Sequence, residues 1–507
     1  MSVSNLSFHS YFSVYSDSNS SAINGNTYFN PFDGDNYSTF NHASVSSDEI
    51  HYSTSTGRIT FNAAGSYLIV FDTPVQLGSS GATSVTGDIR LNGSSIYTSI
   101  SLYANVSVDP RSYTFVKFVE AVKGDYLEVF VKSDSGSITA AALQGSYLTI
   151  FKAHGDYGHI TYDNNGNNTT GARFIGDSDF GGTVSSTLKN VTFTSSTGKL
   201  TPANSKDFLM IVNSMVSTDS TINVELDFTA NSSEVADTLI RVHGTTDPYE
   251  ANYAIIKSLT GGQTSGARVS PSSGAVNTRI NKGTSFSIID LDSSTAKLSL
   301  ACGSDSKSQS SGEVTCFDSA NWQGGSISEE NHITAAGITY AESGGTFTVT
   351  SAGKYLIYSS IVINASNAST KTYKLIQNST TIWTSSMYQN TTWTPQEKTI
   401  CLVVDAAAGD SFKVNVSNVN GTFDSNSAFV MFKVDDFNDL TITTSDLDGN
   451  VSATDNYTIN TFTKNRLSDQ YNRVNNTQVP FVLGTPGPLS LRAKSKSSIT
   501  SPGDSKK

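Results

Sequence analysis

The chain has 507 residues, of which 15% are charged and 10% are aromatic, and its formal net charge is -12. This length exceeds what one hydrophobic core supports and fits three domains of ordinary size. The acidic balance argues against nucleic acid as a partner, because a general binder needs a basic surface to release counterions from phosphates. No run of about 18 apolar residues predicts a membrane-spanning helix.

The abundance of Ser, Thr, Asn and Gly, together with the aromatics, favours strands joined by turns. Long amphipathic helices would need runs of Ala, Leu, Glu, Lys and Arg, which are absent from the sequence. The three cysteines, Cys302, Cys316 and Cys401, cannot build a disulfide framework. An all-β fold is therefore expected, stabilised by burial and hydrogen bonding.

The clearest predicted elements at the start of the chain lie in residues 52–71. They begin with a Ser-Thr-Gly turn in which Gly57 can adopt a positive φ. Ile59 and Phe61 then alternate with polar residues, which predicts a strand with one buried face. The nearly continuous apolar run 67–71 predicts a central strand of a β-sandwich.

The same register recurs twice further along the chain. Residues 52–67 read YSTSTGRITFNAAGSY, and residues 340–355 read YAESGGTFTVTSAGKY. A third copy at 193–208, FTSSTGKLTPANSKDF, keeps the turn glycine but has Lys206 where the other copies have their second glycine. Self-similarity of this kind predicts a repeated structural unit.

Further landmarks follow in the same order in the first and third copies. A strand, a tight turn and a returning strand are expected at 91–96 and again at 376–382. A Gly-Asp turn then leads into an alternating strand, and each unit closes with an apolar strand that ends in Phe-Lys. These later landmarks are at 124–129, 147–152, 409–414 and 429–433, with 282–286 as the counterpart of the Gly-Asp turn in the middle copy.

In their order and spacing these motifs resemble the globular domain of the C1q/TNF family. The resemblance covers residues 8–153, where 12–14 match the first strand of the family, and residues 326–434; it extends only weakly to the middle unit. It implies a ten-stranded jelly roll that forms trimers through an aromatic-rich face. The chain departs from the family in joining three units without a collagen-like Gly-x-y stalk.

We therefore expect three tandem jelly-roll β-sandwiches, 1–153, a diverged 154–320 and 321–434. Residues 435–507 combine few apolar runs with several prolines and a short basic end, which predicts an irregular C-terminal arm.

No pattern predicts catalysis. The seven histidines are scattered, and neither a Gly-x-Ser-x-Gly elbow nor a His-Glu-x-x-His helix occurs. The chain is not expected to be an enzyme, and no catalytic, metal or cofactor-binding residue is assigned. The paired carboxylates of a glycoside hydrolase cannot be recognised from spacing, so that alternative stays open.

Three segments of the sequence could bind a metal ion. Asp-Gly-Asp-Asn at 33–36 and Asp-Leu-Asp-Gly-Asn at 446–450 gather oxygen ligands that suit calcium, although the same residues are common in turns. His-Gly-Asp-Tyr-Gly-His at 154–159 could bind a metal, or it is a polar loop between two domains.

Trp383, Tyr388 and Trp393 are candidate contact residues. Amphipathic aromatic side chains of this kind serve core packing, subunit interfaces and stacking on sugars. The sequence leaves an interface role and a glycan role open.

The combination of tandem jelly rolls, few cysteines and a terminal arm predicts a structural protein on the exterior of a virus particle: a capsid-surface, vertex or fibre protein. The N-terminal residues lack the features of a signal peptide, so assembly in the host cytoplasm is expected, and the arm is a candidate contact for other virion proteins. The alternative is an adhesin that binds a host glycan or receptor, either viral or a bacterial C1q-like lectin at the cell surface.

Two structural expectations follow. Tyr67, Phe71, Tyr355 and Val414 should be buried, because they lie in the most apolar strands. A flat aromatic face left exposed on each unit would favour association, so we expect a homotrimer. Three modules of one chain packed around their own axis are the alternative.

Overall fold

The computed structural model describes residues 2–3, 10–34, 45–46, 49–78, 82–98, 102–105, 110–231, 233–235, 238, 240–244, 249–272, 276–292, 294–303, 305–322, 333–334, 337–389, 395–425, 427–434, 440–443 and 456–459. These residues belong to two units, one formed by His9–Asp436 and one formed by Met1–Phe8 with Phe437–Lys507. Within the described residues the protein is all-β, with antiparallel sheets and two short 3-10 helices, η2 (Ser178–Phe180) and η3 (Ser319–Asn321). The expected fold class is confirmed.

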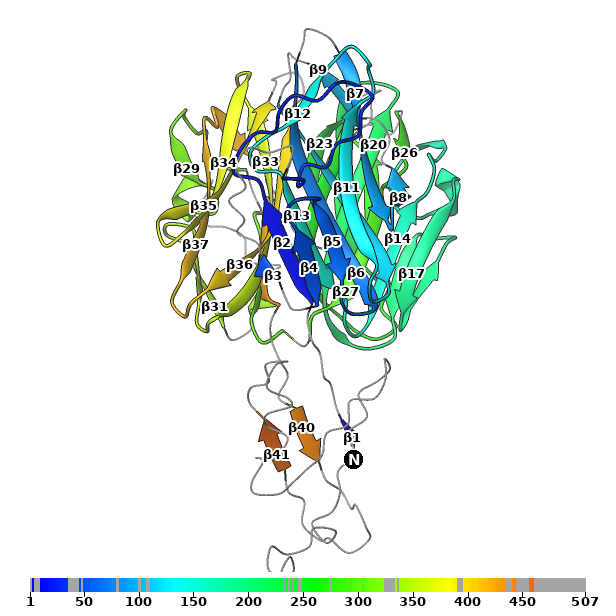
Figure 1. Ribbon diagram of the computed structural model, residues 1–507, viewed down its shortest axis with the longest axis vertical. Coiled ribbons are helices and arrows are strands. Elements are labelled where there is room, and N and C mark those ends of the chain that lie inside the picture. Colours follow the sequence, from blue (N-terminus) through cyan, green and yellow to red (C-terminus); the bar gives the residue numbers. More distant parts are fainter. Residues whose placement is uncertain are drawn as a thin grey trace, which may run out of the picture. The chain divides into compact units, whose positions relative to one another are not determined.

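The unit His9–Asp436 consists of three modules, each a pair of antiparallel sheets (Figure 1). In module 1 the first sheet has the order β10 (Arg111–Ala121), β6 (Gly65–Leu77), β13 (Tyr147–Lys152), β2 (Tyr11–Tyr15) and β3 (Val45–Ser46), and β12 (Ala140–Ala142) also pairs with β6. The second sheet has the order β4 (Ile50–Ser53), β5 (Arg58–Phe61), β11 (Tyr126–Ser133), β7 (Ala82–Leu91) and β8 (Ser94–Thr98), and β9 (Leu102–Asn105) pairs with β7.

Module 2 repeats this order. Its first sheet contains β24 (Tyr249–Leu259), β20 (Lys206–Thr218), β27 (Ser285–Asp290), β14 (Tyr157–Tyr162) and β17 (Val184–Lys189), extended by β26 (Asn277–Ile280) and β15 (Asn168–Thr170). Its second sheet contains β18 (Val191–Thr194), β19 (Lys199–Pro202), β25 (Ser265–Pro271), β21 (Ile222–Ala230) and β23 (Ile240–Gly244), with β16 (Arg173–Phe174) and β22 (Ser233–Glu234) at its sides.

Module 3 has the same arrangement. Its first sheet contains β36 (Gln396–Ala406), β33 (Gly353–Ala365), β39 (Ala428–Lys433), β28 (Lys297–Ala301) and β30 (Ile333–Thr334), with β38 (Gly421–Phe423) beside β33. Its second sheet contains β31 (Ile338–Ala341), β32 (Thr346–Val349), β37 (Ser411–Ser417), β34 (Ser369–Gln377) and β35 (Thr380–Gln389), with β29 (Glu313–Thr315) beside β37. The shared order of strands is that of a jelly-roll sandwich.

The pairing of β28 moves one predicted boundary. β28 lies inside the range 154–320, yet it pairs with β39 of module 3 along its whole length. The boundary between the second and third modules therefore lies between β27 and β28, not at residues 320 and 321. The range 1–153 is also too wide at its start, because β1 (Ser2–Val3) pairs with β40 (Leu440–Thr443) of the other unit.

The predicted turns adopt the expected backbone. Gly57, Gly198 and Gly345 have φ values of 65°, 65° and 55°, a region that glycine enters without a steric penalty. Asn92 and Gly93 also have positive φ at the tip of the hairpin that joins β7 and β8. Positive φ at both central residues matches the right-handed twist of the two flanking strands.

The long central strand of each module is buried on both faces. In β6, Tyr67, Ile69 and Phe71 point into the core of module 1. Leu68 and Val70, on the opposite face, belong to a second cluster that also contains residues of modules 2 and 3. Burial of both faces explains why the sequence of this strand is continuously apolar instead of alternating. Tyr67, Phe71, Tyr355 and Val414 are all 0% exposed, as predicted.

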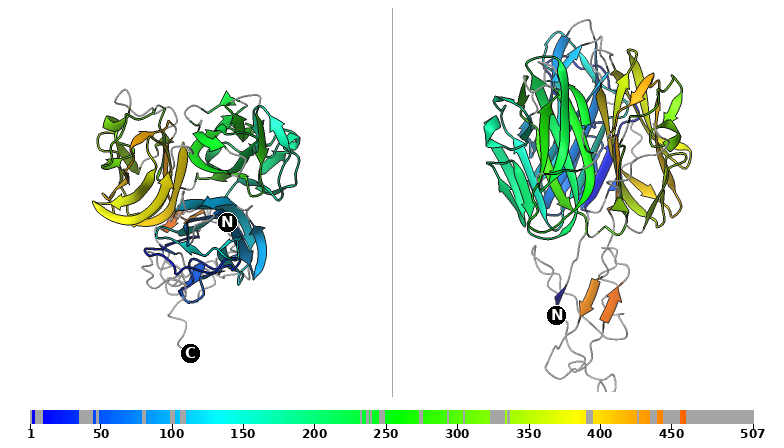
Figure 2. Two further views of the ribbon diagram at one scale, coloured as in Figure 1. Left: turned by 90° about the horizontal axis from the view of Figure 1, so that it is seen from above. Right: turned by 180° about the vertical axis from the view of Figure 1, so that it is seen from behind.

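The second cluster joins the three modules into one unit. Leu209 and Ile211 of β20, and Leu356 and Tyr358 of β33, belong to it together with Leu68 and Val70 of β6. Seen from above, the modules lie side by side around a common centre (Figure 2, left). Apolar faces of the three modules therefore cover one another within one chain.

The other unit contains a three-stranded sheet of β1, β40 and β41 (Asn456–Ile459). Of the predicted arm 435–507, the structure describes only β40 and β41, so the expected irregular remainder lies outside the described residues. Among the described residues, no helix is long and apolar enough to cross a membrane.

Candidate functional site: the polar network between the modules

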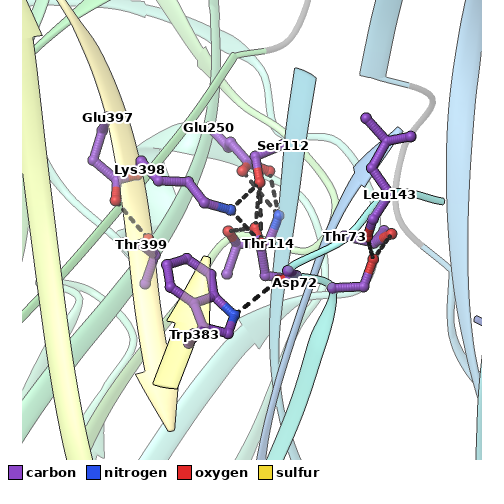
Figure 3. A network of polar contacts seen from close by, with 12 residues as sticks. Asp72, Thr73, Ser112, Thr114, Leu143, Glu250, Trp383, Glu397, Lys398 and Thr399 are labelled. Atoms are coloured by element: carbon purple, nitrogen blue, oxygen red, sulfur yellow. Dashed lines mark hydrogen bonds and ion pairs between the residues drawn. The ribbon is translucent and has the colours of Figure 1, made fainter. Parts of the chain in front are cut away.

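Polar side chains occupy corresponding positions of the strands that meet between the modules. Asp72, Asn213 and Ser360 are each the eighth residue of the long central strands β6, β20 and β33. The neighbouring strands β10, β24 and β36 carry Ser112, Glu250 and Glu397 at their second residue, again in corresponding positions. We call this set, with the side chains that bond to it, the intermodule network; Figure 3 shows the part of it around Asp72, Glu250 and Lys398.

An ion pair joins modules 1 and 3. Lys398 Nζ of β36 lies 2.5 Å from Asp72 Oδ2 of β6, and both side chains are 0% exposed. Lys398 also donates to Ser112 Oγ. Asp72 Oδ1 accepts from Ser112 Oγ and Thr114 Oγ1, each at 2.8 Å. The carboxylate therefore has the additional donors that a buried ion pair needs.

A carboxyl group joins modules 1 and 2. Both oxygens of Glu250, on β24, accept from the backbone N–H of Thr114, on β10, at 2.8 and 3.0 Å. The guanidinium of Arg111 lies 4.8 Å from the ring centre of Tyr249, next to Glu250 in the chain. At the same boundary, Phe118 of module 1 stacks on Tyr157 of module 2 with 5.4 Å between the ring centres.

A second carboxyl group joins modules 2 and 3. Glu397 Oε2, on β36, accepts from the backbone N–H of Asn252, on β24, at 3.2 Å. Its Oε1 accepts from Ser360 Oγ at 3.0 Å and from Thr399 Oγ1 at 2.5 Å. Ser360 Oγ donates as well to the carbonyl of Asn252. Every pair of modules thus shares hydrogen bonds to an acidic side chain.

Burial changes the acidity of the two glutamates. Burial raises the pKa of Glu397 to about 7, although its hydrogen bonds with Thr399 and Ser360 and the charge of Lys398 act in the opposite direction. Burial also raises the pKa of Glu250 well above 4.5, and the nearby carboxylates of Asp72 and Glu397 add to the rise. Burial therefore favours the protonated form of both glutamates.

This arrangement can fix modules in register, but it gives a substrate no access. Glu250 and Glu397 are only 8% and 7% exposed, and their oxygens are occupied by groups of the protein itself. Among the described residues, no group of three or more His, Cys, Asp or Glu side chains could hold a metal ion. The three cysteines are buried.

The structure places two of the three predicted contact aromatics against module 1. Trp383 is 2% exposed, its Nε1 donates to the carbonyl of Gly145 at 3.2 Å, and its ring lies 6.3 Å from that of Tyr147. The backbone N–H of Tyr388 donates to the carbonyl of Pro110 at 2.7 Å. Trp393 lies outside the described residues.

The segments considered for metals are placed in part. His159 is buried, its Nδ1 lies 2.8 Å from Ser287 Oγ, and its ring stacks on Phe118 across the boundary of modules 1 and 2. Asp156 accepts from the side-chain amides of Asn190 and Asn204. Residues 446–450, and 35–36 of the other predicted calcium segment, lie outside the described residues.

Sequence reasoning missed the intermodule network, although a signal was present. When the repeat is aligned on the aromatic residues Tyr67, Phe208 and Tyr355, the same register of an otherwise apolar strand holds Asp72, Asn213 and Ser360. A polar residue at one fixed place in each copy indicates a shared polar centre, because buried polar groups need partners.

Comparisons with known proteins do not identify a family for this chain. No family model matches the chain, and no curated protein matches it. Among solved structures, the chain is similar to pika GITRL, with 11% identity, a TM-score of 0.18, and coverage of 27% of this chain and 95% of that one. It is also similar to a chain in the crystal structure of plant peptide RALF23 in complex with FER and LLG2, with 10% identity, a TM-score of 0.18, and coverage of 46% of this chain and 80% of that one.

Proposed function

We propose that this chain is a structural protein on the exterior of a virus particle, where it acts by assembly and not by catalysis. The observation that carries the proposal is the burial of an ion pair and two carboxyl groups between three jelly-roll modules of one chain. Such contacts hold the modules in one arrangement, because a partner left unpaired in the interior is costly. A protein whose outer surface has one fixed shape can be assembled in many copies in a particle. The step from jelly roll to virus particle is an analogy of fold.

The proposal also concerns family and oligomeric state. The order of the motifs and the strand order shared by the modules support a C1q/TNF-like origin for each module. The faces expected to form a homotrimer belong to the cluster that joins the three modules. We therefore favour a chain that acts as its own pseudo-trimer, and we retain the arm 435–507 as the proposed contact with other virion proteins.

Particles purified from the culture that carries this gene test the proposal. Antibodies raised against the folded full-length chain should label intact particles in electron micrographs, and the chain should sediment with them. Quantitative mass spectrometry then gives its copy number, where many symmetric copies indicate a capsid protein and few copies indicate a fibre. Detection of the chain only in the host cell fraction, or only in opened particles, would reject an exterior role.

A further inference from the structure

The buried pair of Lys398 and Asp72 brings an amine against a carboxyl group. Lys398 Nζ lies 2.5 Å from Asp72 Oδ2, which is shorter than the roughly 2.7–2.9 Å usual for a charged contact of this kind. A carboxyl carbon lies only about 1.2 Å from its oxygens. Cγ of Asp72 is therefore close to Nζ, near the separation of about 3–3.5 Å from which reacting atoms combine. The two groups are placed as the reactants of an amide bond would be.

The surroundings of this pair exclude water and disfavour charge. Both side chains are 0% exposed, and the ring centre of Trp383 lies 5.8 Å from Lys398 Nζ. Burial raises the pKa of both Glu250 and Glu397, which indicates that charge is unfavourable in this part of the interior. A proton passed from Nζ to Asp72 converts the ion pair into a neutral amine and a neutral carboxylic acid. These forms can combine, and they carry no charge that must be desolvated.

Two hydroxyl groups are positioned to assist a reaction between the amine and the acid. Ser112 Oγ accepts from Lys398 Nζ and donates to the carboxylate of Asp72, at 2.8 Å from Oδ1 and 3.0 Å from Oδ2. Because it contacts both partners, Ser112 can carry a proton from the nitrogen to the departing oxygen. Thr114 Oγ1 donates to Oδ1 at 2.8 Å. This hydrogen bond stabilises the negative charge that Oδ1 gains when the nitrogen attacks.

We propose that Lys398 and Asp72 become joined by a covalent amide bond, which the folded protein forms without another enzyme or a cofactor. The neutral amine attacks Cγ of the protonated carboxyl group; a C–N bond forms, the bond from Cγ to Oδ2 breaks, and one water molecule leaves. The oxygen and one hydrogen of that water come from the carboxylic acid, and its other hydrogen comes from Nζ. No electron is transferred, so the reaction needs neither an oxidant nor a reductant.

The amide bond ties the first module of the chain to the third. It closes a loop between residues that are 326 positions apart, and a cross-link across a long loop strongly restricts the unfolded chain. Reactants held in a fixed orientation behave as if present at about 10⁵–10⁸ M, which favours condensation where water is excluded. This inference does not depend on the virus-particle proposal: a linked chain that is absent from particles would keep the bond and lose only that function.

The mass of the denatured full-length chain tests the bond. The purified wild type should be lighter than its sequence by one water molecule, and trypsin should release a branched peptide that contains both Asp72 and Lys398. Lys398→Arg keeps the positive charge but presents no amine that can lose its proton. This variant should have the full mass and migrate more slowly in a denaturing gel. Lys354 and Asp405 are the matched control within the same protein: the side chain of Asp405 is 69% exposed, so this pair should stay unlinked.

A time course after cell-free synthesis tests the part played by Ser112. Ser112→Ala should acquire the bond about a hundredfold more slowly than the wild type, and an equal rate would reject the proton relay. A folded wild type with the full mass of its sequence would reject the bond itself. Loss of water that persists in Lys398→Arg, or a branched peptide that joins other residues, would place the reaction elsewhere and reject the proposal. If Lys398→Arg does not fold, the branched peptide of the wild type decides.

Discussion

Lys398 of module 3 and Asp72 of module 1 form an ion pair that neither module could form alone. The two residues are 326 positions apart in the sequence, and both are fully buried. Each charge needs the other, since a carboxylate or ammonium group moved from water into the interior loses several kcal/mol of solvation. The pair therefore specifies which module lies beside which, in a chain whose three modules share one fold.

Removing one partner of this pair should be costly. We expect Lys398→Met to lower the free energy of unfolding by about 3–5 kcal/mol, because Asp72 is left charged and buried. Lys354→Met is the matched control. Lys354 pairs with Asp405, whose side chain is 69% exposed, and exposed pairs are worth about 0–1 kcal/mol. Urea denaturation measures both variants.

The double variant separates the ion pair from its surroundings. Asp72→Asn combined with Lys398→Met removes both charges and should recover more than half of the loss caused by Lys398→Met alone. Equal stability of Lys398→Met and Lys354→Met would show that the pair is not buried as described.

Stability should fall as pH rises because of Glu397. Its pKa is about 7 in the folded chain against an ordinary value of 4.5. Between these values the folded state binds more protons than the unfolded state, so the free energy of unfolding decreases with pH. The penalty is absent below pH 4.5 and complete above pH 7, and it amounts to about 3 kcal/mol at 1.36 kcal/mol per pKa unit.

Glu397→Gln isolates this contribution. The variant cannot ionise, so its stability relative to the wild type should rise steadily between pH 4.5 and 7. The comparison is needed because other groups titrate nearby. Burial lowers the pKa of His159 well below 6.5, which destabilises the fold as pH falls, while Glu250 acts in the same direction as Glu397. A pH-independent difference between the two proteins would show that Glu397 is not buried in its protonated form.

Two glycines with nearly the same backbone test the contact between modules 1 and 3. Gly145 and Gly124 have φ values of 89° and 96°, so alanine adds strain of about 1–2 kcal/mol at either position. A Cβ at Gly124 meets nothing within 4 Å, whereas at Gly145 it collides with β35. Gly145→Ala should therefore cost about 1–3 kcal/mol more than Gly124→Ala. Equal thermal shifts in calorimetry would contradict this close approach.

The local structure within each module followed from the sequence because it depends on neighbours in the chain. Gly57 marked a turn, and the alternation of Ile59 and Phe61 marked a strand, since these signals come from backbone sterics and strand periodicity. The predicted start of module 3 was wrong because the motif at 340–355 marks β31 to β33 and gives no sign of β28, the first strand of the module. β28 precedes Tyr340 by nearly the same length of chain that separates β2 from Tyr52, so the spacing of the first copy would have located it.

The packing between modules could not be predicted in the same way. The sequence does not show whether an apolar residue such as Leu68 will be covered by another chain or by another module. Asp72 can be recognised in the sequence as a charged residue in an apolar strand. Its partner Lys398, however, lies on an edge strand far along the sequence. Only the arrangement of the three modules brings the two residues together.

The mass of the protein in solution tests that arrangement. Light scattering on the full-length chain at low micromolar concentration should give about 53.9 kDa, because the large apolar faces of the three modules already cover one another. A species of three times that mass, expected from the family resemblance, would need a further interface on the outside of the unit. Lys398→Met provides a second measurement: if the modules hold one another within a chain, loosening their contact should expose apolar surface and produce concentration-dependent aggregates. A wild-type protein that elutes as a trimer at every concentration would restore the homotrimer and reject the self-contained pseudo-trimer.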